Sequence, residues 1–261
     1  GASAVARSHS RGKILKPQSM RSIAAEDSVR RLPTGIADLD AVLGGGILPA
    51  GVMLLAGQPG IGKSTLLMQV AAHVAEQSSV LYVSGEESAS QVKLRATRLG
   101  ATSGDDLQFV ASTSADDIAA TIRSGQYKLV IIDSIQTLSL EEIASAPGTV
   151  SQITNSSNVI IRAAKASGAA VILVGHVTKE GSIAGPKVLE HLVDVVLQFE
   201  GDRYGGFKVV RAAKNRYGST SEAAIFEMND KGLRVVENPS AALLAERQNA
   251  DGSVVLATLE G

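Results

Sequence analysis

The stretch that decides the fold is Gly57-Gln58-Pro59-Gly60-Ile61-Gly62-Lys63-Ser64, followed by Thr65. Its spacing matches G-x-x-x-x-G-K-[ST], a loop whose backbone surrounds phosphate groups in nucleotide-binding proteins. A short apolar run, residues 52–56, precedes the loop, and residues 66–75 are apolar at helical spacing. Strand, glycine loop and helix in this order are the context that the motif requires. The sequence therefore predicts a nucleotide-binding site, with an ordinary glycine turn as the alternative.

The residue types in this loop suit a triphosphate. Gly57, Gly60 and Gly62 allow the backbone to curl so that its N–H groups face one point. The helix that begins near Lys63 adds the positive end of its dipole. Lys63 can reach the β- and γ-phosphates, and Ser64 offers its hydroxyl to Mg²⁺. We therefore predict ATP or ADP with Mg²⁺ as cofactors, bound by the nine residues from Gly57 to Thr65.

Composition limits the class of protein and its partners. The 261 residues leave room for one large α/β domain, and a hydrophobic content of 44% is enough for a sizeable core. The net charge of -1 provides no global basic field, so any DNA contact must be a local patch. The chain has no cysteine, which excludes disulfides and cysteine-ligated zinc within these residues. There is no apolar run of transmembrane length and no evident signal peptide, so we expect a cytoplasmic protein without a membrane partner.

Two further apolar runs lead into acidic residues. Residues 80–83 are followed by Glu86 and Glu87, and residues 129–132 are followed directly by Asp133. Ligands bind at the carboxyl ends of the strands in open parallel sheets. Glu86, which lies nearer the strand end than Glu87, is predicted to activate the water that attacks the γ-phosphate, and Asp133 is predicted to hold Mg²⁺ with the loop serine. The alternative for the glutamates is a favourable charge at the N-terminus of the next helix.

Three other features are candidates for the same site. His176 closes an apolar strand and is either a sensor of the γ-phosphate or a satisfied polar residue. The loop at residues 177–187 contains glycines and lysines, so it either suits a phosphodiester chain or is simply solvated. Lys214 and Arg216 are two residues apart on a strand and share a face. They have the spacing for reaching a neighbour's γ-phosphate, as an arginine finger does, or they form a plain surface turn.

The remaining pattern predicts an α/β fold with a mostly parallel sheet flanked by helices and an antiparallel edge over residues 193–236. Thr34 is expected to cap a short helix, Ser114 is expected to cap a helix over residues 116–124, and residues 136–157 are expected to form a long loop. We expect a disordered linker or tag at residues 1–28, the ATPase domain at residues 29–237, and the start of a truncated C-terminal domain at residues 238–261.

Taken together, the motifs resemble the bacterial RadA (Sms) family of RecA-like recombination and repair ATPases. The resemblance covers roughly residues 32–239. Its most specific part is the pentapeptide at residues 214–218, where the family usually has Phe in place of Tyr217. The other matching segments are residues 39–46, 57–65, 83–88, 132–137 and 174–181.

The resemblance implies a RecA-like P-loop fold and a DNA-stimulated ATPase and helicase that drives branch migration in recombination and DNA repair. It places Glu86 as the water-activating base, Asp133 as the Mg²⁺ partner and His176 at the γ-phosphate sensor position. It implies that Lys214 and Arg216 act in trans on the adjacent subunit's nucleotide. It places residues 181–187 on the DNA-binding loop, so the predicted DNA-binding residues are Lys179, Gly181, Ser182 and Lys187.

The resemblance also implies partners and missing parts. Single-stranded and branched DNA, a RecA-type recombinase and a hexameric ring of identical subunits are the expected partners. The family's four-cysteine zinc module, which would bind zinc, and its Lon-protease-like domain are expected outside these residues, before the linker and beyond Gly261. The alternatives are a nucleotide-switched ring-assembly protein with little turnover, or a RecA relative of the replicative-helicase or clock-protein kind.

Overall fold

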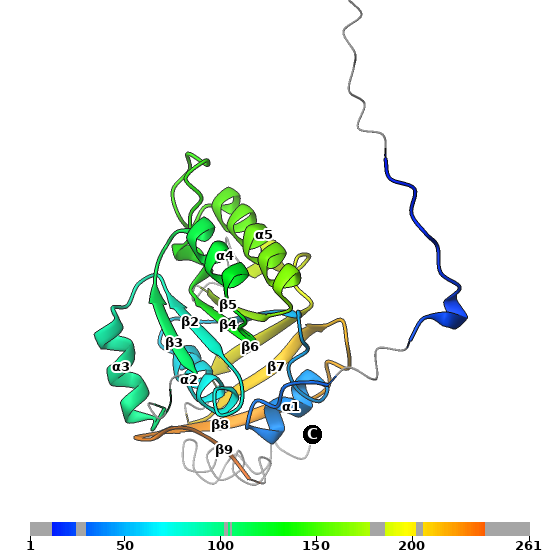
Figure 1. The fold of residues 1–261 in the computed structure, drawn as a ribbon. Coiled ribbons are helices and arrows are strands. Elements are labelled where there is room, and N and C mark those ends of the chain that lie inside the picture. Colours follow the sequence, from blue (N-terminus) through cyan, green and yellow to red (C-terminus); the bar gives the residue numbers. More distant parts are fainter. Residues whose placement is uncertain are drawn as a thin grey trace, which may run out of the picture.

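The apolar runs form the middle of one sheet with the strand order β3-β2-β4-β5-β1-β6-β7-β8-β9 (Figure 1). The computed structural model describes residues 12–24, 30–101, 104, 106–177, 186–201 and 206–237. Within these residues the strands are β1 (Val52–Gly57), β2 (Val80–Ser84), β3 (Leu107–Ala111), β4 (Leu129–Asp133), β5 (Ala170–His176), β6 (Val195–Gly201), β7 (Lys208–Asn215), β8 (Ala223–Asn229) and β9 (Gly232–Val235).

The first six strands are parallel, and the last three form an antiparallel edge. The helices of the described residues are α1 (Ala37–Leu43), α2 (Lys63–Val74), α3 (Ala89–Arg98), α4 (Ala115–Ser124), α5 (Val150–Ser167) and α6 (Pro186–Leu189), with short 3-10 turns at η1 (Met20–Ser22) and η3 (Ile135–Thr137). The predicted fold class is therefore confirmed: this is an α/β RecA-like P-loop fold.

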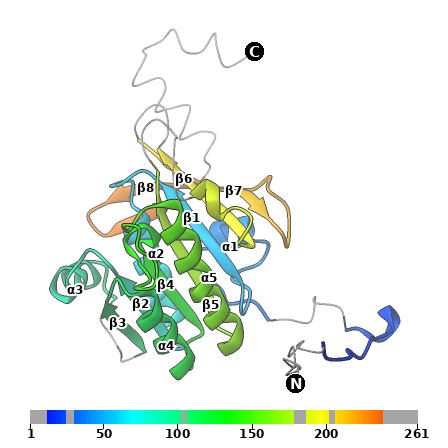
Figure 2. The same ribbon diagram turned by 90° about the horizontal axis from the view of Figure 1, so that it is seen from above.

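Helices cover both faces of the sheet because the central strands are apolar on both sides. One core cluster joins α1, α2 and α3 to the face that contains Met53 and Leu55 of β1. The other cluster joins α4 and α5 to the opposite face, which contains Val52 and Leu54. Figure 2 looks onto the face that α4 and α5 cover. Every residue of β1, β2 and β4 is buried, in agreement with the unbroken apolar runs of the sequence.

The predicted long loop at residues 136–157 is wrong, because α5 already begins at Val150. The side chain of Thr149 caps this helix by accepting a hydrogen bond from the backbone N–H of Gln152. Small and amide side chains of the first turns face inward, and Gln152 is only 1% exposed. A polar helix face that points inward looks like a loop in the sequence, which explains the error.

Two predicted helix caps have different outcomes. Ser114 caps α4 as predicted, since its hydroxyl accepts a hydrogen bond from Asp117 N–H at 3.1 Å. Thr34 does not cap α1, whose N-cap is Ile36. The Thr34 hydroxyl instead donates to the Asp40 carboxylate at 2.8 Å. The predicted linker and C-terminal boundaries fall largely on residues 1–11, 25–29 and 238–261, which lie outside the described residues, so the domain limits stay predictions.

Candidate active site

The phosphate loop joins the end of β1 to the start of α2, as predicted. Gly60 and Gly62 have φ angles of 80° and 120°, in the left-handed region that favours glycine. A Cβ atom at Gly57 would lie 2.7 Å from the carbonyl oxygen of Phe199, so this position also requires glycine. The tight backbone of the loop therefore depends on its glycines, which is the feature that a phosphate cradle needs.

Lys63 is enclosed by the loop that it follows. Its exposed fraction is 3%, and its Nζ donates hydrogen bonds to the carbonyl oxygens of Gly57 and Gln58, the latter at 2.8 Å. Burial lowers the pKa of Lys63 from 10.5 to about 8, and the nearby Asp133 carboxylate partly opposes this effect. The ammonium is thus held beside the loop at a cost in desolvation that an anionic ligand would offset.

Asp133 ends β4 beside the loop, and the structure brings it together with Ser64 as predicted. One carboxylate oxygen, Oδ2, accepts a hydrogen bond from Ser64 Oγ at 2.7 Å. Both groups are hard oxygen donors, the kind of ligand that Mg²⁺ prefers. The same oxygen also accepts a hydrogen bond from the Tyr82 hydroxyl at 2.9 Å. The donor set therefore fits a Mg²⁺ ion bound with phosphate, and Tyr82 supports its carboxylate.

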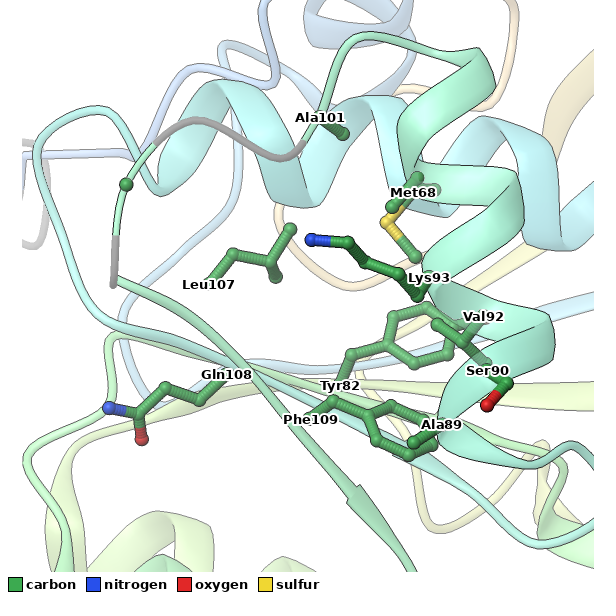
Figure 3. Close-up of a pocket in the computed structure, with 12 residues that line it drawn as sticks. Met68, Tyr82, Ala89, Ser90, Val92, Lys93, Ala101, Leu107, Gln108 and Phe109 are labelled. Atoms are coloured by element: carbon green, nitrogen blue, oxygen red, sulfur yellow. The ribbon is translucent and has the colours of Figure 1, made fainter.

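Tyr82 is a residue that sequence reasoning missed. Its ring forms part of a cleft of about 480 Å³ between α3 and β3, where it stacks on Phe109 with ring centroids 6.4 Å apart (Figure 3). Burial, followed by the Asp133 charge, raises the pKa of Tyr82 well above 10.0, so the hydroxyl remains a donor. The contact depends on β2 lying next to β4, and the sequence contains no signal for that neighbour relation.

The two glutamates after β2 have different surroundings. Glu87 pairs with Arg95 of α3 at 2.5 Å, and its N–H donates to Ser84 Oγ at 3.0 Å. Glu86 is exposed, and its charge acts on His176. The pair with Glu87 holds the Arg95 side chain half-buried, at 22% exposure. The assignment of the base to Glu86 stays a prediction, and the pairing of Glu87 agrees with that choice.

His176 ends β5 next to the loop, in register with Gly57 of β1. Gln136 holds its backbone on both sides: the amide nitrogen donates to His176 O at 3.0 Å, and His176 N–H donates to the amide oxygen at 3.2 Å. Its Nδ1 is buried and has no hydrogen-bond partner in the part of the chain that the structure describes. Burial and the Lys63 charge lower the pKa of His176, although Asp133 and Glu86 oppose them, so the imidazole is neutral at pH 7.

The structure does not bring Lys214 and Arg216 to the phosphate loop of their own subunit. Lys214 pairs with Val196 of β6, beside the first half of β1, while the loop follows the end of β1. Its Nζ donates to the backbone oxygens of Glu190 at 2.6 Å and Val193 at 2.9 Å. Arg216 donates through Nη1 to the Asp194 carboxylate at 2.7 Å. Sequence reasoning missed Asp194, although an acid inside a predicted apolar strand is a signal that a partner exists.

Of the four predicted DNA-binding residues, Lys179, Gly181 and Ser182 lie outside the described residues. Lys187 is exposed and lies in the short helix α6, not in the loop that was predicted to contain it. Glu190, which follows α6, accepts a hydrogen bond from Lys214 through its backbone oxygen. Lys187 is therefore close in the sequence to a residue that holds one member of the predicted trans-acting pair.

A glycine loop between a buried parallel strand and a helix, beside an acidic strand end, defines a P-loop nucleotide-binding protein. The chain belongs to the family described as AAA domain, whose model matches residues 19–182. Over the described residues there is no helix both long and apolar enough to cross a bilayer.

Bacterial proteins named DNA repair protein RadA are similar to almost the whole chain. The relative from Pseudomonas aeruginosa is 49% identical over 255 residues, which cover 96% of this chain and 56% of the relative. The relative from Halalkalibacterium halodurans is 49% identical over 250 residues, or 95% of this chain and 54% of the relative. The one from Bacillus subtilis is 46% identical over 256 residues, or 97% and 56%. The chain thus spans a little over half the length of these curated relatives, and its resemblance to RadA is confirmed over that portion.

Proposed function

We propose that the chain is the ATP-hydrolysing part of a DNA-stimulated motor for recombination and DNA repair. In this proposal the nine residues from Gly57 to Thr65 hold ATP, and Ser64 and Asp133 hold Mg²⁺, which neutralises charge on the phosphates when bound. Glu86 orients and deprotonates the attacking water, and His176, neutral at pH 7, detects the γ-phosphate. The relatives are named as DNA repair proteins, which supports DNA as the partner.

The observation that carries the proposal is the position of Lys214 and Arg216 relative to the loop. The Arg216 guanidinium is bound to Asp194, whose other carboxylate oxygen accepts the N–H of Val52 at the start of β1. The five steps from Val52 to Gly57 cover about 16 Å at the rise of a parallel strand. That distance is longer than an extended arginine side chain. If these cations act on a phosphate, the phosphate therefore belongs to another subunit.

A trans contact makes assembly part of the mechanism. Stabilising the transition-state charge from a neighbouring protein is worth a factor of 10³–10⁵ in known P-loop enzymes, so isolated subunits should be poor ATPases. We propose a ring, hexameric in the whole protein, that works with a RecA-type recombinase on single-stranded and branched DNA and drives branch migration. Lys187, together with Lys179, Gly181 and Ser182, is the proposed DNA contact.

The proposal is tested by ATP turnover with and without single-stranded DNA, and by mixing subunits. Subunits with Lys63→Ala lack a working loop but keep both cations, whereas subunits with Arg216→Ala keep the loop. Each variant alone should be nearly inactive. Mixed assemblies should regain turnover, because an Arg216 from one subunit serves the nucleotide of the other. A mixture that stays as inactive as its parts, or turnover that ignores DNA, would count against the proposal.

A further inference from the structure

Asp194 is a buried carboxylate to which the nucleotide site assigns no role. It is 3% exposed and lies immediately before β6. Its Oδ2 accepts the N–H of Val52 at 2.9 Å, and its Oδ1 accepts Nη1 of Arg216 at 2.7 Å. Its backbone oxygen also accepts the N–H of Arg216 at 2.9 Å. Both ends of the residue therefore fix Arg216 relative to the first residue of β1.

The negative charge of Asp194 is not needed for the strand contact. An asparagine at this position would still accept the Val52 N–H through its amide oxygen. An ion pair with one buried partner is weak evidence for stability, because removing the carboxylate from water offsets much of its attraction to the guanidinium. The charge is better explained by the orientation that it imposes on the guanidinium, whose planar fork fits a carboxylate.

Arg216 is held on one side and open on the other. Its side chain is 53% exposed while that of Asp194 is 4% exposed. Within the part of the chain that the structure describes, the Arg216 side chain makes its hydrogen bond through one nitrogen, Nη1, to Asp194. A guanidinium has five donors, so most of them remain for an acceptor outside the subunit. The segment just before Asp194 also fixes Lys214, because Lys214 Nζ donates to the backbone oxygens of Glu190 and Val193.

We propose that Asp194 is a positioning residue for ATP hydrolysis: it orients Arg216 so that the open edge of the guanidinium meets the phosphate of the adjacent subunit. The inference rests on the proposed trans role of Arg216. It adds that the turn from Glu190 to Asp194 fixes in advance the geometry of both cations, so that little orientation is lost when the subunits meet. A misplacement of about 1 Å in such a contact costs on the order of a hundredfold in rate.

The test uses assembled protein and donor subunits whose own loop is disabled. Acceptor subunits have Arg216→Ala, and donor subunits have Lys63→Ala, either alone or combined with Asp194→Asn. Because a donor subunit hydrolyses nothing, a defect of its own nucleotide site cannot change the readout. Donors with Lys63→Ala alone should restore turnover. Donors that combine Lys63→Ala with Asp194→Asn should restore at most about one tenth of that turnover. The affinity of the acceptor subunits for ATP should not change.

A matched control is Asp40→Asn in the donor. Asp40 is also a carboxylate that ties down a backbone segment, because its Oδ1 accepts the N–H and the hydroxyl of Thr34 at 2.9 and 2.8 Å. Donors that combine Lys63→Ala with Asp40→Asn should restore the same turnover as donors with Lys63→Ala alone. Thermal unfolding and the mass of the assembly check that each donor folds and assembles. If Asp194→Asn fails this check, Asp194→Glu replaces it, and the same loss is expected because the carboxylate is displaced by one methylene group.

The outcomes separate this inference from the proposal on which it rests. Equal rescue by donors with and without Asp194→Asn overturns the positioning role while leaving the trans role intact. Greater rescue by Asp194→Asn donors also overturns it, because Asp194 would then restrain Arg216 from acting. No rescue by Lys63→Ala donors overturns the trans role, and the inference with it.

Discussion

Lys63→Met is expected to stabilise the folded protein at pH 7 in the absence of nucleotide, although it removes nucleotide binding. Lys63 is 3% exposed, and burial lowers its pKa from 10.5 to about 8. Folding therefore costs free energy while this group is charged. Methionine has a similar length, fits an apolar surrounding and carries no charge. The substitution removes the cost of burying the charge together with the group that is predicted to reach the phosphates.

The magnitude follows from the pKa of Lys63 in the two states. The difference between 10.5 and about 8, at 1.36 kcal/mol per pH unit, corresponds to roughly 3 kcal/mol. Water at the exposed loop residues Gln58, Pro59 and Gly60 screens the charge, so we expect about 1–3 kcal/mol in practice. At about 2–4 °C per kcal/mol for a chain of this size, the unfolding midpoint should rise by several degrees.

The pH dependence has a definite sign. Below pH 8 Lys63 is charged in both states, and the folded state bears the full cost. Between pH 8 and 10.5 the folded state loses the proton while the unfolded state keeps it, so the stability of the unmodified protein rises with pH. Lys63→Met lacks this rise. The difference in free energy of unfolding between the two proteins should therefore be largest near pH 7 and shrink towards pH 10.5.

Urea unfolding at several pH values from 7 to 9.5 measures this difference, with Lys231→Met at an exposed position as the control. ATP at a hundred times its Kd should stabilise the unmodified protein by about 2.7 kcal/mol and should not stabilise Lys63→Met. The reasoning is refuted if Lys63→Met is less stable than the unmodified protein at pH 7. It is also refuted if the two proteins have the same slope with pH.

Two further predictions concern the catalytic base and the start of α5. Glu86→Gln should lower ATP turnover in steady-state kinetics by roughly a hundredfold or more with unchanged nucleotide affinity. Glu87→Gln should mainly lower stability in thermal unfolding, because it breaks the ion pair with Arg95. The reverse pattern would make Glu87 the base. Gln152→Ala should cost roughly 2–3 kcal/mol in urea unfolding, because Gln152 donates to the backbone oxygens of Leu140, Ile143 and Ser145 and accepts Leu140 N–H. The exposed Asn155→Ala on the same helix is its control, and equal losses for the two would contradict the role of Gln152.

The central strands and the phosphate loop could be predicted because their signals are local. Unbroken apolar runs predict buried parallel strands, and the spacing of glycines and lysine around Lys63 predicts a cradle. The start of α5 was missed because Gln152 and Ser156 face inward there, which reverses the usual polarity of a helix. Their role depends on the segment that they contact, and a hydropathy pattern contains no information about that segment.

The contacts that tune the site could not be predicted because they depend on strand order. The Tyr82 hydroxyl reaches Asp133 across 51 positions in the sequence, and Arg216 reaches Asp194 across 22. Each pair exists because two strands lie next to each other or because one turn meets the end of another. Residue types can predict that a carboxylate or a guanidinium matters, but the partner that orients it is decided by topology.

The two ends of β1 have different functional neighbours. Gly57 at one end leads into the loop that is predicted to hold the phosphates, and Val52 at the other end is bonded to the carboxylate that holds Arg216. Every residue of the strand is buried, so its length separates the two positions rigidly. A buried strand of this kind does not bend, so it cannot bring the Arg216 guanidinium at one end to the phosphate loop at the other end of the same subunit. In the proposed ring, it would keep a constant spacing between the phosphate that one subunit binds and the cation that the same subunit offers to the next. For that reason the geometry of each catalytic contact in a ring would depend on Asp194 of one subunit and on Gly57 of its neighbour.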